Sequence, residues 1–213
     1  MMDFYDAARK TVIWLNEEYR STVSKYMTNK SNVILGRKFS LGTEFQYEFA
    51  KRLFEGSSYL VLVDTPIKLP NRKQRVYPDI VIIKDNELRG LMEVKMDCGW
   101  IGEDKLKDEL ETYKEITNSS SFSYSTYTDE SMEKKKPFPE VVIPKNIKKI
   151  FVIVSRKNDH DRIDEYVREL VETAGFELLI LLENTHPNGR VNSTEIEEDI
   201  AKRKDEIRKI INF

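Results

Sequence analysis

The sequence predicts an α/β domain in which a central mixed sheet is flanked by helices and extended by helices near both ends of the chain. Two observations support this class. The aliphatic runs 150–154 and 176–182 enclose a helical segment, which predicts a parallel strand–helix–strand unit with a right-handed crossover. The runs 76–83 and 91–96 are joined by a short polar stretch, which predicts an antiparallel hairpin. A sheet that contains both pairings is mixed.

Composition sets the broad class. A chain of 213 residues with 39% hydrophobic and 34% charged residues suits one globular domain. We find neither a signal-like start nor an apolar run near the roughly 20 residues of a membrane helix, so a cytoplasmic protein without membrane contact is expected. The single cysteine, Cys98, excludes an internal disulfide and any four-cysteine metal site. With a net charge of −2, nucleic acid would have to be bound by a local basic patch.

The first 40 residues are predicted to form a helical arm. Phe4, Ala8, Val12 and Leu15 recur at helical spacing, which predicts a helix over residues 3–28 and then a link. A packing or dimerisation role is the plain interpretation of this helix.

A second helix is predicted from about Thr43 to Glu55. Thr43 and Gln46 fit a capping box, and Gly56 ends the helix. The apolar stripe that contains Phe49 extends backwards onto Gln46, which is therefore the polar side chain aimed at the packing partner, unless it only caps the helix.

The hairpin of residues 77–97 carries charges that buried strands do not ordinarily hold. A β run at 58–69 and a loop with Arg72, Lys73 and Arg75 precede it. A turn at 84–87 places Asp79 and Lys95 at the same end of the antiparallel pair, and alternation puts Glu93 on the face of Lys95. Asp79, Glu93 and Lys95 are therefore expected to converge.

The remaining segments complete the predicted core, which spans residues 41–183 of a single domain. A helix is expected at 103–116, a helix at 161–174, and a C-terminal helix at 194–211 that opens with a Thr194–Glu197 capping box. Residues 117–139 are rich in Ser, Thr and Tyr and too long for an ordinary connection, so a flexible insertion is expected there, either disordered or a mobile flap.

The converging charges suggest a hydrolytic site. Two adjacent carboxylates repel each other, and a divalent cation with oxygen ligands, such as Mg²⁺, removes that conflict. Such an ion can activate water for attack on a phosphodiester, while Lys95 orients the water and offsets negative charge. A buried structural ion pair of Lys95 with one carboxylate is the alternative, and it leaves the other carboxylate unexplained.

Pro78–Asp79 followed after thirteen residues by Glu93–Val94–Lys95, on adjacent strands after a helix, resembles the PD-(D/E)xK nuclease superfamily. The resemblance covers about 43–155 and implies a restriction-endonuclease-like core. It implies that Asp79, Glu93 and the Val94 carbonyl bind the metal and that Lys95 is catalytic. Residues 42–46 look most like Mrr-type restriction endonucleases and Holliday-junction resolvases. Those proteins place a glutamate where this chain has Gln46, and a shift of two residues would make Glu44 or Glu48 the extra ligand.

The expected function is Mg²⁺-dependent hydrolysis of DNA, with Mn²⁺ as a substitute and an endonuclease as the expected mode. The loop of Arg72, Lys73 and Arg75 would contact DNA phosphates, unless it is simply solvated. Cleavage of both strands needs two sites, so a homodimer is expected, with the terminal helices as candidates for its interface. The alternatives are a catalytically inactive nuclease-fold protein that binds nucleic acid or a protein partner, and an unrelated interaction module.

Overall fold

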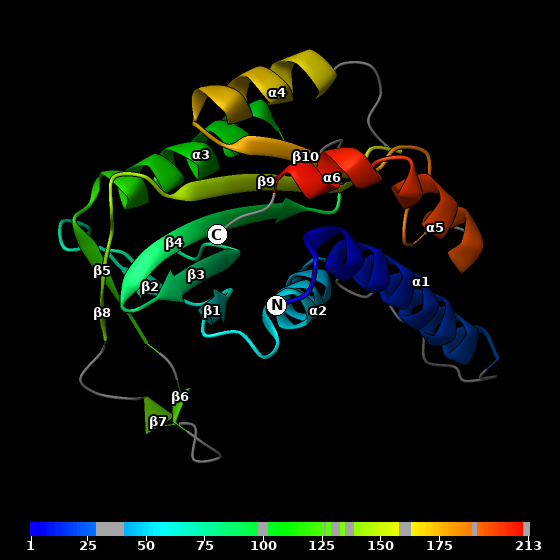
Figure 1. Ribbon diagram of the computed structural model, residues 1–213, viewed down its shortest axis with the longest axis horizontal. Coiled ribbons are helices and arrows are strands. Elements are labelled where there is room, and N and C mark those ends of the chain that lie inside the picture. Colours follow the sequence, from blue (N-terminus) through cyan, green and yellow to red (C-terminus); the bar gives the residue numbers. More distant parts are fainter. Residues whose placement is uncertain are drawn as a thin grey trace.

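A mixed sheet with helices on both faces forms the centre of the protein in the computed structural model (Figure 1). The structure describes residues 1–28, 41–97, 102–125, 127–128, 133–134, 139–157, 163–188 and 191–210. Within these ranges the main sheet has eight strands, and a separate two-stranded ribbon is formed by β6 (Tyr127–Thr128) and β7 (Glu133–Lys134). The predicted α/β class with a mixed sheet between helices is confirmed.

Strand β4 (Glu87–Lys95) is the longest strand and organises the sheet. On one side it pairs antiparallel with β3 (Ile80–Lys84), which pairs with β1 (Leu60–Val63). On the other side it pairs parallel with β9 (Lys148–Ser155), which pairs parallel with β10 (Glu177–Leu182). The parallel unit at the C-terminal end is therefore present as predicted, with helix α4 (Ile163–Thr173) in its connection.

A second branch of the sheet leaves the start of β4. Glu87 pairs with Val142 of β8 (Glu140–Val142), and the order continues through β5 (Ser121–Tyr124) to β2 (Ile67–Lys68). Strand β5 lies within the segment expected to be a flexible insertion. The part of 117–139 that the structure describes therefore contributes a strand to the main sheet.

The turn between β3 and β4 fixes the register of the hairpin. Asp85 and Asn86 both have positive φ, 54° and 59°, which short polar side chains tolerate and which two-residue hairpin turns require. The register pairs Ile80 with Met92. Asp79, one residue before β3, is thereby carried next to Glu93.

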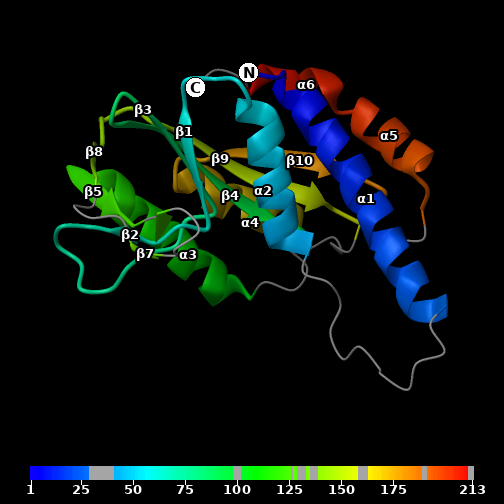
Figure 2. The same ribbon diagram turned by 90° about the horizontal axis from the view of Figure 1, so that it is seen from below.

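Alternation along β4 divides the interior into two cores. Met92 and Val94 face α1 (Phe4–Thr28), α2 (Leu41–Phe54), α5 (Ser193–Ala201) and α6 (Lys204–Lys209). Leu91 faces the opposite core with α3 (Glu103–Asn118) and α4. Figures 1 and 2 show α1 and α2 on one side of the sheet and α3 and α4 on the other.

Two capping predictions are wrong. Helix α2 begins at Leu41, so Thr43 lies inside its first turn and does not cap it. The capping box at the other end is formed by Asn192 and Glu195, because the Asn192 side chain accepts the Glu195 amide while the Glu195 side chain accepts the Asn192 amide. Thr194 is therefore within α5 as well.

Two element boundaries also differ. The predicted β run of residues 58–69 splits into β1 and β2, since Asp64 adopts a φ of 44° between them. The predicted C-terminal helix divides into α5 and α6 around Arg203. The link predicted after residue 28 lies outside the described residues.

The terminal helices, which were candidates for a dimer interface, bury their apolar faces within the chain. Phe4 of α1 packs edge-on against Phe49 of α2 with 5.0 Å between ring centroids. The same core includes Ile200 of α5 and Ile207 of α6. Among the described residues, no helix has the length and apolar character needed to cross a membrane.

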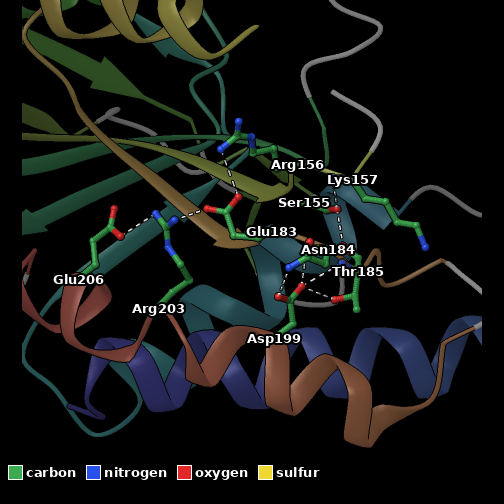
Figure 3. A network of polar contacts seen from close by, with 9 residues as sticks. All are labelled: Ser155, Arg156, Lys157, Glu183, Asn184, Thr185, Asp199, Arg203 and Glu206. Atoms are coloured by element: carbon green, nitrogen blue, oxygen red, sulfur yellow. Dashed lines mark hydrogen bonds and ion pairs between the residues drawn. The ribbon is translucent and has the colours of Figure 1, made fainter. Parts of the chain in front are cut away.

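A buried polar network ties α5 to the end of β10 (Figure 3). Asp199 accepts the backbone N–H groups of Asn184 and Thr185 at 2.8 and 2.9 Å, as well as both of their side chains. Beside it, Glu183 pairs with Arg156 and Arg203. These contacts anchor the C-terminal helices to the sheet.

Candidate functional site

A cleft of about 310 Å³ opens where β3 begins and β4 ends. Its walls come from three places: the segment that leads into β3, the C-terminal half of β4, and helix α3. The charged and polar residues that line it are Arg72, Arg75, Tyr77, Asp79, Glu93, Lys95, Glu109, Thr112 and Tyr113. The structure thus brings Asp79, Glu93 and Lys95 together, as the hairpin geometry predicts.

Asp79 is held in place by backbone contacts. Its Oδ2 accepts the N–H of Val94 at 2.7 Å, and its own N–H donates to the Tyr113 hydroxyl at 3.2 Å. In an extended strand the N–H and C=O of one residue point to the same side, so the Val94 carbonyl is directed to the side where Asp79 lies.

Glu93 is nearly inaccessible to solvent, with 5% of its surface exposed. The Tyr113 hydroxyl donates to its Oε2, and the Lys95 ammonium contacts its Oε1. The orientation of this carboxylate is therefore fixed by one residue of its own strand and one of α3.

Lys95 lies between two carboxylates. Its Nζ contacts Glu93 and lies 2.7 Å from Oε2 of Glu109 on α3. Burial alone would lower the pKa of Lys95, but the charges and hydrogen bonds of Glu93 and Glu109 outweigh it and raise that pKa. Lys95 is consequently charged at neutral pH.

The two strand carboxyl groups are in conflict. Burial, followed by the charge of Glu93, raises the pKa of Asp79 to about 7, although the Val94 N–H and Lys95 oppose the shift. Burial and the same carboxylates also raise the pKa of Tyr113, so its phenol remains a donor. A divalent cation matches this set of donors, because Asp79, Glu93 and the Val94 carbonyl are oxygen ligands and the added positive charge relieves the carboxylate repulsion.

Helix α3 supplies two site residues that sequence reasoning missed. Glu109 and Tyr113 are four residues apart and therefore lie on one face of the helix, above Lys95 and Glu93 respectively. Tyr113 belongs to the buried stripe of α3. The signal available in the sequence was Glu109 one helical turn before Tyr113, on the helix that directly follows the hairpin.

Helix α2, which was expected to complete the site, covers the other face of the sheet. Gln46 is buried, but it lies on the helix that packs with Met92 and Val94, and it does not line the cleft. Glu44 is exposed, and Glu48 pairs with Lys51 and Arg52 at 3.5 and 3.4 Å. None of these three side chains lines the cleft that contains Asp79.

The basic loop lies at the cleft, as its position in the sequence predicts. Arg72 and Arg75 line the cleft, whereas Lys73 is exposed on the same loop and does not. Arg72 is engaged in an ion pair with Glu115 at 2.5 Å. Arg75 is exposed and donates to the Ser125 hydroxyl at 3.4 Å.

Comparisons of the chain with protein-family models, curated proteins and solved structures found no match.

Proposed function

We propose that this chain hydrolyses DNA phosphodiester bonds with the help of Mg²⁺, for which Mn²⁺ can substitute, on a restriction-endonuclease-like core. The observation that carries the proposal is the meeting of Asp79, Glu93 and Lys95 in one open cleft. Two carboxylates and an ammonium held among aliphatic side chains are costly to the fold. Such arrangements are concentrated at functional sites.

The residues divide the work as follows. Asp79, Glu93 and the Val94 carbonyl would hold the ion, which when bound supplies a Lewis acid and a more acidic water. Lys95 stays charged beside them, where it can orient the attacking water and offset the charge that develops on the phosphate. Glu109 positions Lys95, and Tyr113 positions Glu93.

Cleavage of plasmid and linear DNA with Mg²⁺ or Mn²⁺ tests this function. We expect the wild-type chain to nick or cut, and Asp79→Ala to lose at least 100-fold of that activity. Asp108→Ala is the matched control, because Asp108 is exposed on α3 and does not line the cleft. Equal and negligible cleavage by the wild type and Asp79→Ala would refute the proposal.

A catalytically inactive nuclease-fold protein that binds nucleic acid or a protein partner is the second candidate. The observation that favours it is that both oxygens of Glu93 already have partners, Lys95 and Tyr113, so this carboxylate is satisfied within the chain. Calorimetric titration with Mn²⁺ separates the two. The hydrolase should bind Mn²⁺ and lose that binding in Glu93→Gln, whereas an inactive protein should show no such heat in either form.

A further inference from the structure

The two walls of the cleft carry opposite charge. The wall that leads into β3 presents Arg72 and Arg75. The other wall is α3, which presents Glu109, Thr112, Tyr113 and Ile116 to the cleft and no cation among these lining residues. A double helix carries phosphates on both of its strands, and each phosphate contact calls for a cation. The α3 wall offers no cation to the phosphates of a second strand.

The cationic wall is rigidly held. The loop is closed at its base by the backbone pair of Ile67 and Val76, at 2.9 and 3.0 Å. The Lys68 ammonium donates to the carbonyls of Arg72 and Lys73 inside the loop. Because Arg72 is engaged with Glu115, Arg75 is the guanidinium that this wall can offer to a single phosphate backbone.

An exposed aromatic ring lies beside the predicted reacting position. Tyr77 lines the cleft and 62% of its surface is exposed. It precedes Asp79 by two residues, and both residues line the same cleft. Every base offers a flat face that stacks on such a ring, and this stacking supplies affinity that does not depend on many phosphate contacts.

We propose that the cleft takes unpaired, single-stranded DNA, with the backbone along Arg75 and a base next to the reacting phosphate stacked on Tyr77. This inference rests on the proposed function for the identity of the reacting phosphate. The stacking requires the base to be free of its partner, and the α3 wall has no lining cation to hold a second strand. Sequence preference is weak in this mode of binding, because stacking accepts all four bases.

Metal-free binding measurements test the substrate class separately from cleavage. Fluorescence anisotropy in EDTA would compare a labelled 20-nucleotide oligothymidine with a labelled 20-base-pair duplex. We expect the single strand to bind at least tenfold more tightly, Tyr77→Ala to weaken it about tenfold, and Tyr77→Phe to retain it. Tyr47→Ala is the matched control, because Tyr47 is 55% exposed on α2 and does not line the cleft.

Two outcomes would overturn the inference: duplex binding as tight as single-strand binding, or Tyr77→Ala binding within twofold of the wild type. Failure of the proposed function gives a different result, namely no cleavage of either DNA with Mg²⁺ or Mn²⁺. Duplex cleavage that Tyr77→Ala leaves unchanged would support the function and refute the single-strand inference.

Discussion

Two aspartates in polar networks of this protein have opposite electrostatic situations. Asp199 has 2% of its surface exposed and accepts four hydrogen bonds from Asn184 and Thr185 (Figure 3). Burial would raise the pKa of Asp199, but these donors outweigh it and lower that pKa. Asp79 accepts one backbone N–H and lies beside Glu93, and its pKa rises to about 7.

The difference shows how to tell a structural carboxylate from a functional one. Hydrogen-bond donors that match the lone pairs of a buried carboxylate stabilise its ionised form, as at Asp199. Where a second carboxylate lies beside it in place of donors, the charge of a carboxylate destabilises the fold, as at Asp79. A fold retains such a cost where the residue serves chemistry. The cleft, and not the network around Asp199, is therefore the candidate active site.

The largest expected effect is the loss of DNA cleavage when a charged residue of the cleft is replaced. Lys95→Met keeps most of the length of the side chain and removes its charge, so we expect cleavage to fall by at least 100-fold. Lys149→Met is the matched control, because Lys149 is also partly buried but donates to the Ala174 carbonyl outside the cleft, and it should retain activity within twofold. Circular dichroism would verify that both variants fold. More than a tenth of wild-type activity in Lys95→Met would contradict the role given to the ammonium.

A substitution in the network around Asp199 should affect stability and not activity. Asp199→Ala leaves the buried N–H group of Thr185 and the partly buried N–H group of Asn184 without their acceptor, so we expect the free energy of unfolding to fall by about 2–4 kcal/mol. Urea denaturation measures this, with the exposed Asp205→Ala of α6 as control. DNA cleavage per folded molecule should not change. A loss below about 0.5 kcal/mol would show that the hydrogen bonds contribute little.

Asp79→Asn should instead raise the free energy of unfolding at neutral and higher pH. Because the native pKa of about 7 lies above the ordinary value of 3.8, the native state holds a proton between those pH values that the unfolded chain has lost. Wild-type stability should therefore fall as pH rises from 4 to 7. Asparagine carries no charge and keeps an acceptor for Val94, so the variant should lose this slope and be about 1–3 kcal/mol more stable at pH 8.

The measurement is urea denaturation in EDTA at pH 4 and pH 8. The two proteins should have nearly equal stability at pH 4, which is close to the ordinary carboxyl pKa of 3.8, so that the unfolded chain also holds much of the proton. A wild type that is the more stable of the two at pH 8 would mean that Asp79 is satisfied in the fold, as Asp199 is.

The hairpin and its three charges could be predicted from sequence because they depend on local rules. Alternation fixes which residues of a strand share a face, and the polar pair Asp85–Asn86 indicates a tight turn. The convergence of Asp79, Glu93 and Lys95 follows from those two facts alone. Neither inference needs knowledge of which helix covers the sheet.

The sequence could not show which helix packs over those charges. Helical periodicity identifies the buried stripe of a helix but not the face of the sheet on which it packs. Gln46 and Tyr113 both lie on buried stripes, and only the packing assigns Tyr113 to the cleft. The strand β5 was missed because its sequence, Ser121–Tyr124, has no aliphatic run, although Phe122 and Tyr124 alternate as buried strand residues do.

The smallest expected effect therefore comes from Gln46, the residue that sequence reasoning placed in the site. Gln46→Ala should leave the affinity for Mn²⁺ within twofold of the wild type, because α2 packs on the face of Met92 and Val94, whereas Glu93 projects from the other. Calorimetric titration with Mn²⁺ measures this affinity, and Glu93→Gln in the same experiment shows the loss expected when a metal ligand is removed. A tenfold loss of affinity in Gln46→Ala would mean that α2 reaches around the end of β4, where a Cβ added at Gly42 would lie 3.9 Å from Met96 Cγ, and that both faces of the sheet contribute to the site.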